Sequence, residues 1–367
     1  MGEPLDALVE ARKGQHLELA ATQDVEAAVG AGWSDIRLVH QSLPVADLEA
    51  IDLGVPFLGR RLAMPLMIAG MTGGHARAAE VNACLARAAE RHGIAMGVGS
   101  QRAAVRRPDL AYTFGTAREH APTALVIGNI GAPQLVAQGS TAPLSVAEIR
   151  TLLGVVRADA LAIHLNYLQE LVQPEGDRRA AGVLEAIEQV VQQVAVPVIA
   201  KETGAGMSRR TSQLLAGAGA AALDVGGLGG TSFAAVEALR AKEGGDVRGQ
   251  VLGRTYRDWG IPTAVAVVEA VPAGIPVIAT GGIRTGLDAA KALALGATLV
   301  GVARPLLSAA LEGGDAAVDA WVTGFAEELR AAVFLTGCRA PHELRSCPRV
   351  ILGETREWLN QLTPLTP

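Results

Sequence analysis

Short apolar runs recur along the chain, and most of them end in glycine or in a polar residue. Eight runs have the length of a buried strand: 65–70, 95–100, 124–129, 160–165, 197–202, 221–226, 276–281 and 299–304. Strands of a parallel sheet are covered on both faces, so they are continuously apolar instead of alternating. The pattern therefore predicts eight parallel strands.

The segments between these runs have helical patterns. Examples are Ala76–His92, a segment that begins with the capping pair Ser145 and Glu148, and Asp288–Leu295, which Gly296 would end as a C-cap residue. Eight strand-then-helix units in one chain favour a closed barrel over an open doubly wound sheet. We predict an α/β fold, a (β/α)8 TIM barrel.

Three regions follow from this strand count. Residues 1–60 form an N-terminal extension, 61–340 the barrel, and 341–367 a C-terminal tail whose helices pack on the barrel. The longest gap between strands, 227–275, contains the sequence AKEGGDVRGQ and then a helix opened by Pro262. We expect the charged part of this gap to be a mobile loop over the site. The charge-free stretch 121–147 reads as a buried strand and its loop.

Composition and charge narrow the functional classes. Of the 367 residues 50% are hydrophobic, which excludes a disordered chain and provides enough apolar side chains for a core. Lys and Arg number 32 against 37 Asp and Glu, so the net charge is -5. This balance argues against nonspecific binding to nucleic acid or to an anionic membrane.

Cysteine spacing and the first residues indicate the compartment. Cys84, Cys338 and Cys347 are odd in number and lack CxxC spacing, which argues against a disulfide framework or a zinc site. The N-terminal sequence MGEPLDALVEARKGQH has acidic residues where a signal peptide has bases, and it lacks an apolar segment. We expect a cytoplasmic protein.

Polar residues gather at the predicted C-terminal ends of the strands, where barrels of this kind carry their chemistry. In strand order they are Met71-Thr72-Gly73-Gly74, Ser100-Gln101-Arg102, Asn129, His164 with Asn166, Gln169 and Glu170, Lys201-Glu202, and Gly229-Gly230-Thr231-Ser232. A packed core requires none of these side chains. Their positions predict a ligand site at one end of the barrel.

The last two strands lead into loops suited to a phosphate. They carry Gly281-Gly282-Ile283-Arg284 and Ala303-Arg304, each followed by a helix. Glycine lets a phosphate approach the backbone, helix N-terminal N–H groups point at it, and an arginine adds a charge-assisted hydrogen bond of about 1.5–3 kcal/mol. The alternative is that the glycines serve only tight turns.

Several of these residues allow a second interpretation. Lys201 could be a Schiff-base nucleophile, a cofactor partner or half of a structural ion pair, and the glycines after it favour a cofactor partner. His164 could be a core histidine, and Glu170 a solvent-facing acid at a helix start. Arg12 and Lys13 alone would read as the solvated face of a helix.

In their order and spacing these residues form motifs of a known family. The motifs are RKGQH, AGMTGGH, GSQR, HLNYLQE followed by QPEGD, KETGAGMS, GGLGGTSF and ATGGIRTGLDAAKALALGA. From Arg12 to about Gly337 the chain resembles the type 2, FMN-dependent isopentenyl diphosphate isomerases. The resemblance implies the interconversion of isopentenyl and dimethylallyl diphosphate in isoprenoid biosynthesis.

The resemblance also implies roles for individual residues. The flavin would contact Met71, Thr72, Gly73, Ser100, Asn129, Lys201 and Thr231, and its phosphate Gly282, Ile283, Arg284, Ala303 and Arg304. Substrate would contact Arg12, Lys13, Ser100, Gln101, Arg102, His164, Asn166 and Gln169. Glu170 would bind Mg²⁺ with the diphosphate, and Gln169 and Lys201 would be the catalytic residues. NADPH would serve as reductant, and a homo-oligomer, a tetramer or octamer, is implied.

Protonating an unactivated alkene requires an acid held against it in a dry pocket. Apart from Glu170, which the metal would occupy, the sequence offers no acidic side chain obviously placed there. Reduced FMN is then the remaining acid and base. Two rival functions stay open: an FMN-dependent oxidoreductase of the 2-hydroxy-acid oxidase type, and a non-catalytic flavin or phosphate-binding module. The first requires a base, usually a histidine, before the seventh strand, where RTYRDWGIPT has none.

Overall fold

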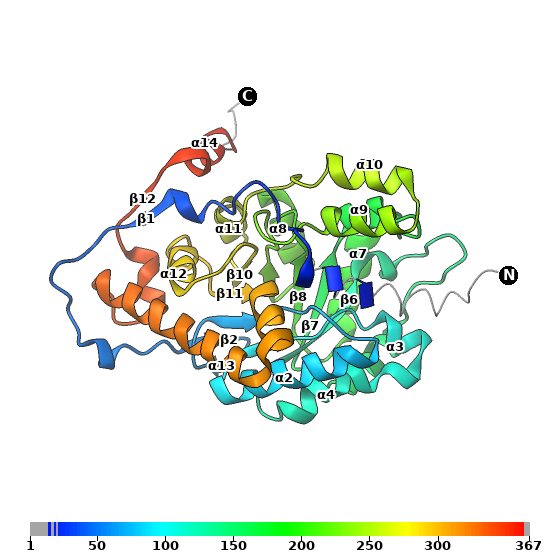
Figure 1. Ribbon diagram of the computed structural model, residues 1–367, viewed down its shortest axis with the longest axis horizontal. Coiled ribbons are helices and arrows are strands. Elements are labelled where there is room, and N and C mark those ends of the chain that lie inside the picture. Colours follow the sequence, from blue (N-terminus) through cyan, green and yellow to red (C-terminus); the bar gives the residue numbers. More distant parts are fainter. Residues whose placement is uncertain (1–13, 16–17, 20, 363–367) are drawn as a thin grey trace.

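A closed barrel of eight parallel strands forms the centre of the molecule (Figure 1). The computed structural model describes residues 14–15, 18–19 and 21–362. The strands neighbour one another in the order β10-β11-β4-β5-β6-β7-β8-β9. They are β4 Leu66–Ile68, β5 Ala95–Gly97, β6 Val126–Gly131, β7 Ala160–Leu165, β8 Val198–Glu202, β9 Ala222–Asp224, β10 Val277–Thr280 and β11 Leu299–Val302. The predicted barrel is confirmed. Seven of the eight apolar runs contain one of its strands, and the run 124–129 overlaps the eighth, β6, which extends to Gly131.

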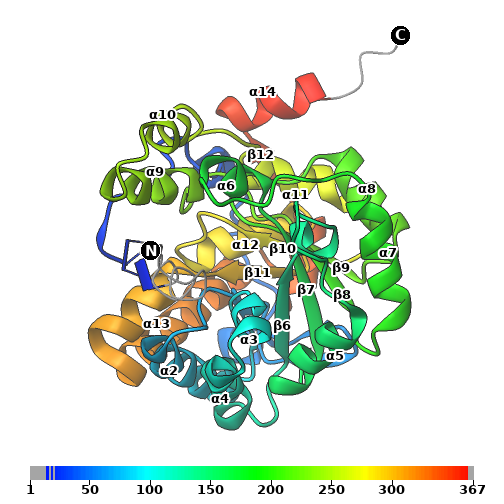
Figure 2. The ribbon, with the colours of Figure 1, turned by 90° about the vertical axis from the view of Figure 1, so that its right-hand side faces the viewer.

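Helices surround the barrel, as Figure 2 shows. They are α2 Ala76–His92, α3 Arg102–Arg106, α4 Tyr112–His120, α5 Val146–Val155, α6 Tyr167–Val172, α7 Val183–Gln193, α8 Arg209–Gly217, α9 Phe233–Glu243, α10 Val247–Thr255, α11 Thr263–Ala270, α12 Gly286–Ala294, α13 Arg304–Leu335 and α14 Gly353–Leu362. The capping box of Ser145 and Glu148 is confirmed at α5. Helix α12 begins two residues earlier than predicted because Thr285 and Asp288 form a second capping box.

The predicted mobile loop in 227–275 is wrong, because the charged sequence AKEGGDVRGQ lies in two helices. It spans the end of α9, a turn at Gly244 and Gly245, and the start of α10. The Ser232 side chain accepts a hydrogen bond from the N–H of Ala235 and so caps α9. Gly245 has a φ of 71°, which suits the turn between the helices. Pro262 does precede α11, as predicted.

A hairpin closes the N-terminal end of the barrel. Strands β2 (Val55–Phe57) and β3 (Arg60–Leu62) pair with each other, and Val55, Phe57 and Leu62 join one core cluster with the inward side chains of the barrel strands. The hairpin crosses residue 60, where the predicted extension meets the predicted barrel. Among the described residues, apolar side chains fill this end of the barrel.

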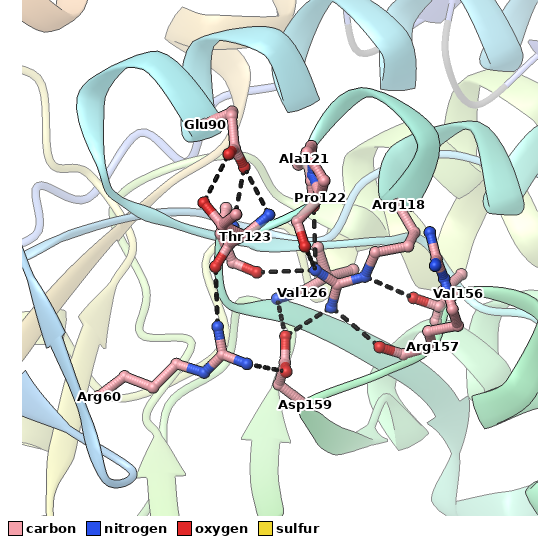
Figure 3. Close-up of polar contacts among 11 residues, drawn as sticks. Arg60, Glu90, Arg118, Ala121, Pro122, Thr123, Val126, Val156, Arg157 and Asp159 are labelled. Carbon is pink, nitrogen blue, oxygen red and sulfur yellow. Dashed lines mark hydrogen bonds and ion pairs between the residues drawn. The ribbon is translucent and has the colours of Figure 1, made fainter.

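A buried arginine fixes the loops at this same end (Figure 3). Arg118 donates hydrogen bonds to the carbonyl oxygens of residues 121, 122, 124, 156 and 157. It also pairs with Asp159, whose Oδ2 accepts from the N–H of Val126 at 2.9 Å. These bonds hold the starts of β6 and β7 in place.

A strand of the N-terminal extension pairs with a strand of the C-terminal tail outside the barrel. Strand β1 (Ile36–Leu38) pairs antiparallel with β12 (Arg349–Ile351), and α14 follows (Figure 1). Short 3-10 helices complete the fold: η1 Trp33–Asp35, η2 Leu48–Ala50, η3 Pro108–Leu110, η4 Ala132–Leu135, η5 Val271–Ala273 and η6 Pro341–Ser346. Among the described residues, every helix is too short or too polar to cross a membrane.

Candidate active site

A cavity of about 250 Å³ opens at the C-terminal ends of the strands. Sixteen of the residues predicted to form the site line it: Met71, Thr72, Gly73, Ser100, Arg102, Asn129, His164, Asn166, Gln169, Glu170, Lys201, Thr231, Gly282, Ile283, Ala303 and Arg304. The tertiary structure thus brings residues from both halves of the chain together. Gln169 and Lys201, the two predicted catalytic residues, line the same space.

Two of the predicted residues that the structure describes, Gln101 and Arg284, do not line the cavity. Gln101 is fully buried, accepts from the N–H of Asn129 at 3.0 Å and donates to the carbonyl of Leu152 at 2.9 Å. The Arg284 side chain turns toward the N-terminal extension, where it pairs with Glu26. Arg12 and Lys13 lie outside the described residues.

Strand register sets a polar row on three neighbouring strands. His164 is the register partner of Lys201, and Lys201 is the partner of Asp224. Lys201 Nζ lies 3.1 Å from Asp224 Oδ2 and donates to the carbonyl of Glu202 at 2.9 Å. Asp224 is 1% exposed, so this ion pair is buried. Lys201 therefore has a structural partner and also faces the cavity, which combines two of its predicted interpretations.

The proton on His164 is fixed by its neighbour. Asn129 Nδ2 donates to the carbonyl of Val98 at 3.0 Å, which turns its Oδ1 toward His164 Nδ1 at 2.8 Å. Since an amide oxygen only accepts, Nδ1 carries the hydrogen. In the neutral tautomer with that hydrogen on Nδ1, Nε2 is the hydrogen-bond acceptor. His164 lines the cavity and so is not only a core histidine.

A buried carboxylate orients the Gln169 amide. Gln169 Nε2 donates to Glu237 Oε1 at 2.9 Å, and Gln169 Oε1 accepts from Asn166 Nδ2 at 3.1 Å. Glu237 comes from α9, also accepts from Gln173 at 2.5 Å, and pairs with Arg240. With both ends of its amide held, Gln169 has one orientation at the cavity wall.

Glu170 belongs to a second polar group on the cavity wall. It is 6% exposed, so the interpretation as a solvent-facing helix-start acid is excluded. Its oxygens accept from Asn166 Nδ2 at 2.9 Å and from the N–H of Asp177 at 2.8 Å. Asp177 in turn pairs with Arg102. The described residues hold no cluster of three or more His, Cys, Asp or Glu that could bind a metal by themselves.

The loop after β8 is tied to one carboxylate. Glu202 Oε2 accepts from the N–H groups of residues 203, 204, 205 and 206. Burial raises the pKa of Glu202 to about 7, while the N–H groups of residues 203, 204 and 205 and the charge of Lys201 act in the opposite direction. Thr203 and Gly204 of this loop line the cavity.

The loops after β10 and β11 approach the cavity with their backbones. Gly281 and Gly282 have φ values of 123° and 66°, so the turn itself requires glycine. A Cβ on Gly282 would lie 2.5 Å from Ala31 Cβ and from the carbonyl of Gly229. Both loops lead into helices, α12 and α13, and this geometry suits a phosphate.

The sequence analysis did not identify the acidic residues that form ion pairs or hydrogen bonds with the predicted site residues. Asp224 left a signal, because it is a carboxylate inside an apolar strand run. Glu237 left none, since an acid on a helix usually faces solvent. Glu26 also left none, because it lies far along the chain from the arginines that it contacts.

The family model for FMN-dependent dehydrogenases matches residues 16–107 and 176–349. Similar curated proteins are named isopentenyl-diphosphate delta-isomerase. The one from Methanosarcina barkeri is 48% identical over 95% of this chain and 94% of its own length. The one from Methanothermobacter thermautotrophicus is 46% identical over 96% and 97%, and the one from Archaeoglobus fulgidus is 45% identical over 95% and 98%.

Solved structures show the fold at lower identity. Mandelate oxidase with (S)-2-phenylpropionate is 20% identical, with a TM-score of 0.63 over 94% of this chain and 98% of that one. Mandelate oxidase with 3,3-difluoro-2-hydroxy-3-phenylpropionic acid gives a TM-score of 0.61 at 20% identity over the same shares. At this identity the likeness concerns the fold alone.

Proposed function

We propose, from the premise that this chain belongs to the FMN-dependent dehydrogenase family and to the isopentenyl-diphosphate delta-isomerases, that it interconverts isopentenyl and dimethylallyl diphosphate. The observation that carries the proposal is the shared cavity of Gln169 and Lys201, bordered by the glycine loops after β10 and β11. The enzyme would act in isoprenoid biosynthesis with reduced FMN as cofactor.

The residues present fit FMN. Gly282, Ile283 and Ala303, from the loops after β10 and β11, line the cavity and would bring their backbone toward a phosphate. Arg304 also lines it, and Arg284 lies on the same loops. Met71, Thr72, Gly73, Ser100, Asn129 and Thr231 would border the ring system. When bound, reduced FMN would supply the proton donor and the proton acceptor for the allylic rearrangement.

The chain's own residues would position and insulate this chemistry. Lys201, held by Asp224, places a positive charge that stabilises negative charge on a reduced ring. Gln169, which Glu237 and Asn166 keep in one orientation, would contact the reacting end of the substrate. His164 presents Nε2 to the cavity wall, where it would orient the substrate.

The diphosphate would bind on the side of Glu170. Mg²⁺ is commonly bound by one or two carboxylates together with substrate phosphates and water. Glu170, buried beside Asn166, fits that pattern. Ser100, Arg102 and Asn166 would contact the diphosphate. Gln101 would act through Asn129, and Arg12 and Lys13 would close over the head group from the extension.

Three further proposals concern the enzyme's surroundings. NADPH would keep the flavin reduced. The protein would act in the cytoplasm, without nucleic acid or membrane partners. It would assemble as a homo-oligomer, a tetramer or octamer.

Turnover under anaerobic conditions tests the proposal. Isomerase activity is measured on the apoprotein, on protein with oxidised FMN, and on protein with FMN reduced by NADPH or dithionite. We expect activity only in the third sample and only with Mg²⁺. Equal rates in all three would exclude the flavin. Consumption of oxygen or NADPH in proportion to product would instead support the oxidoreductase. If the wild type shows no activity for Gln169→Ala and Lys201→Ala to lose, the protein is a non-catalytic module.

A further inference from the structure

One acidic residue of the N-terminal extension lies between the two arginines of the phosphate loops. Glu26 Oε1 is 2.5 Å from Arg284 Nη2 and 3.2 Å from Arg304 Nη1. Arg284 follows β10 and Arg304 follows β11, so a single carboxylate oxygen joins the loops after two neighbouring strands. The assigned roles of the two arginines do not account for this third residue.

The backbone around Glu26 is fixed on both sides. Glu26 forms a bridge with Thr231, a cavity residue, and hydrogen bonds join residues 25 and 27 to 232 and 230 at 2.7 and 2.9 Å. Arg257 Nη2 donates to the carbonyl of Glu26 at 2.8 Å. Further along the segment, Ala31 fills the space where a Cβ on Gly229 or Gly282 would lie. The carboxylate is therefore placed by the main chain.

The Glu26 carboxylate reduces the repulsion between the two guanidinium groups. Two guanidinium groups repel each other, so an anion must lie between them if they are to stay on adjacent loops. Arg304 Nη2 also donates to the carbonyl of Gln23 at 2.9 Å, so both of its Nη atoms are held by the extension. One carboxylate between two guanidinium groups leaves a net charge of +1. This charge lies beside the loops after β10 and β11, which we call the phosphate cradle, and it still attracts a phosphate.

We propose that Glu26 is a positioning residue for the phosphate of the cofactor. It holds Arg284 and Arg304 together at the cradle and couples the extension to the loops that receive a phosphate monoester. This inference rests on the proposed function, because it takes FMN as the ligand of the cradle. It predicts that Glu26 affects recognition of the phosphate and leaves recognition of the isoalloxazine ring unaffected.

Flavin titration separates these two parts. Apoprotein of the full chain is titrated with FMN and with riboflavin, which has the same ring system and no phosphate, and binding is followed by flavin fluorescence. For Glu26→Gln we expect the dissociation constant for FMN to rise about tenfold, because the charge-assisted contacts that hold the two arginines are lost. The dissociation constant for riboflavin should change less than twofold. Glu26→Asp should fall between this variant and the wild type.

Asp24→Asn is the matched control. Asp24 lies two residues away on the same segment, is 84% exposed and pairs only with Arg257 among the described ion pairs. This variant should leave both affinities unchanged. An equal loss of FMN and riboflavin affinity in Glu26→Gln would overturn the inference, as would unchanged or tighter FMN binding. A wild-type protein that binds riboflavin and FMN equally weakly would instead contradict the proposed function.

Discussion

The two ends of the barrel use buried cations in opposite ways. At the closed end, the Arg118 guanidinium donates to five carbonyls and to Asp159, and it does not line the cavity at the open end (Figure 3). At the open end, the Lys201 ammonium has Asp224 and one carbonyl, and it lines the cavity. A cation surrounded by main-chain acceptors stabilises loops, whereas a cation with one side on a cavity can act on a ligand.

The same contrast holds for the carboxylates. At the closed end, Asp159 accepts from the N–H of the first residue of β6, and Glu90 accepts from two N–H groups just before that strand. Glu170 and Glu237 at the open end accept from the side-chain amides of Asn166 and Gln169. The open end also has backbone donors, because Glu202 accepts from four N–H groups and Glu170 from that of Asp177. What distinguishes the open end is its additional side-chain amide partners, which set the orientation of groups that face the cavity.

The largest effect should follow from Lys201→Ala. We expect kcat to fall about 1000-fold, because the positive charge at the flavin is lost. Asp224 is left buried without its partner, so stability should also fall by about 3 kcal/mol. The double variant Lys201→Ala with Asp224→Asn separates the effects in a urea titration and a kinetic assay. Stability should recover while activity does not, and recovery of activity would contradict the assigned role.

Arg118→Ala should have the converse effect. Removing a buried guanidinium that satisfies five carbonyls and an acid should lower the free energy of unfolding by about 3 kcal/mol, with kcat per folded molecule unchanged. Urea denaturation measures the loss. Arg87→Ala is the control, because the Arg87–Asp315 pair is about 40% exposed and should contribute less than about 1 kcal/mol. Equal effects of the two variants would remove the distinction between the ends.

Gln169→Ala should reduce kcat about 100-fold, since a side chain oriented at the reacting end is lost. Its stability should change by less than about 1 kcal/mol, because Glu237 keeps Gln173 and Arg240 as partners. Steady-state kinetics and thermal melting measure the two quantities. A large change in melting temperature with little change in kcat would assign Gln169 to the core.

The smallest expected effect is a pH dependence from Glu202, whose raised pKa of about 7 compares with an ordinary value of 4.5. Below pH 4.5 the carboxyl is protonated in both folded and unfolded chains. Between pH 4.5 and 7 the unfolded chain ionises first, so folding stability falls as pH rises. Lys201 is the charged neighbour. The free energy of unfolding, measured between pH 4.5 and 7, should depend less on pH in Glu202→Gln than in the wild type. An equal pH dependence in both proteins would assign it to other groups.

Much of the site was predictable because a parallel barrel places every strand end on one rim. Once the eight apolar runs were counted, the polar residues after them, such as Asn129, His164 and Lys201, had to lie together. The helices over 233–255 were not predicted, because the pair Gly244 and Gly245 reads as a loop although it makes only a turn between two helices. Local composition could not distinguish these cases.

By itself, the sequence determined the strand number, the rim on which the site lies and most of the residues that line it. Those features follow from local periodicity and from chain order. Only the tertiary structure decided that Asp224 faces Lys201, that Glu237 holds Gln169, and that Glu26 joins Arg284 to Arg304. Such partners are set by strand register and by the packing of distant segments, and the residues near them in the chain carry no trace of that register.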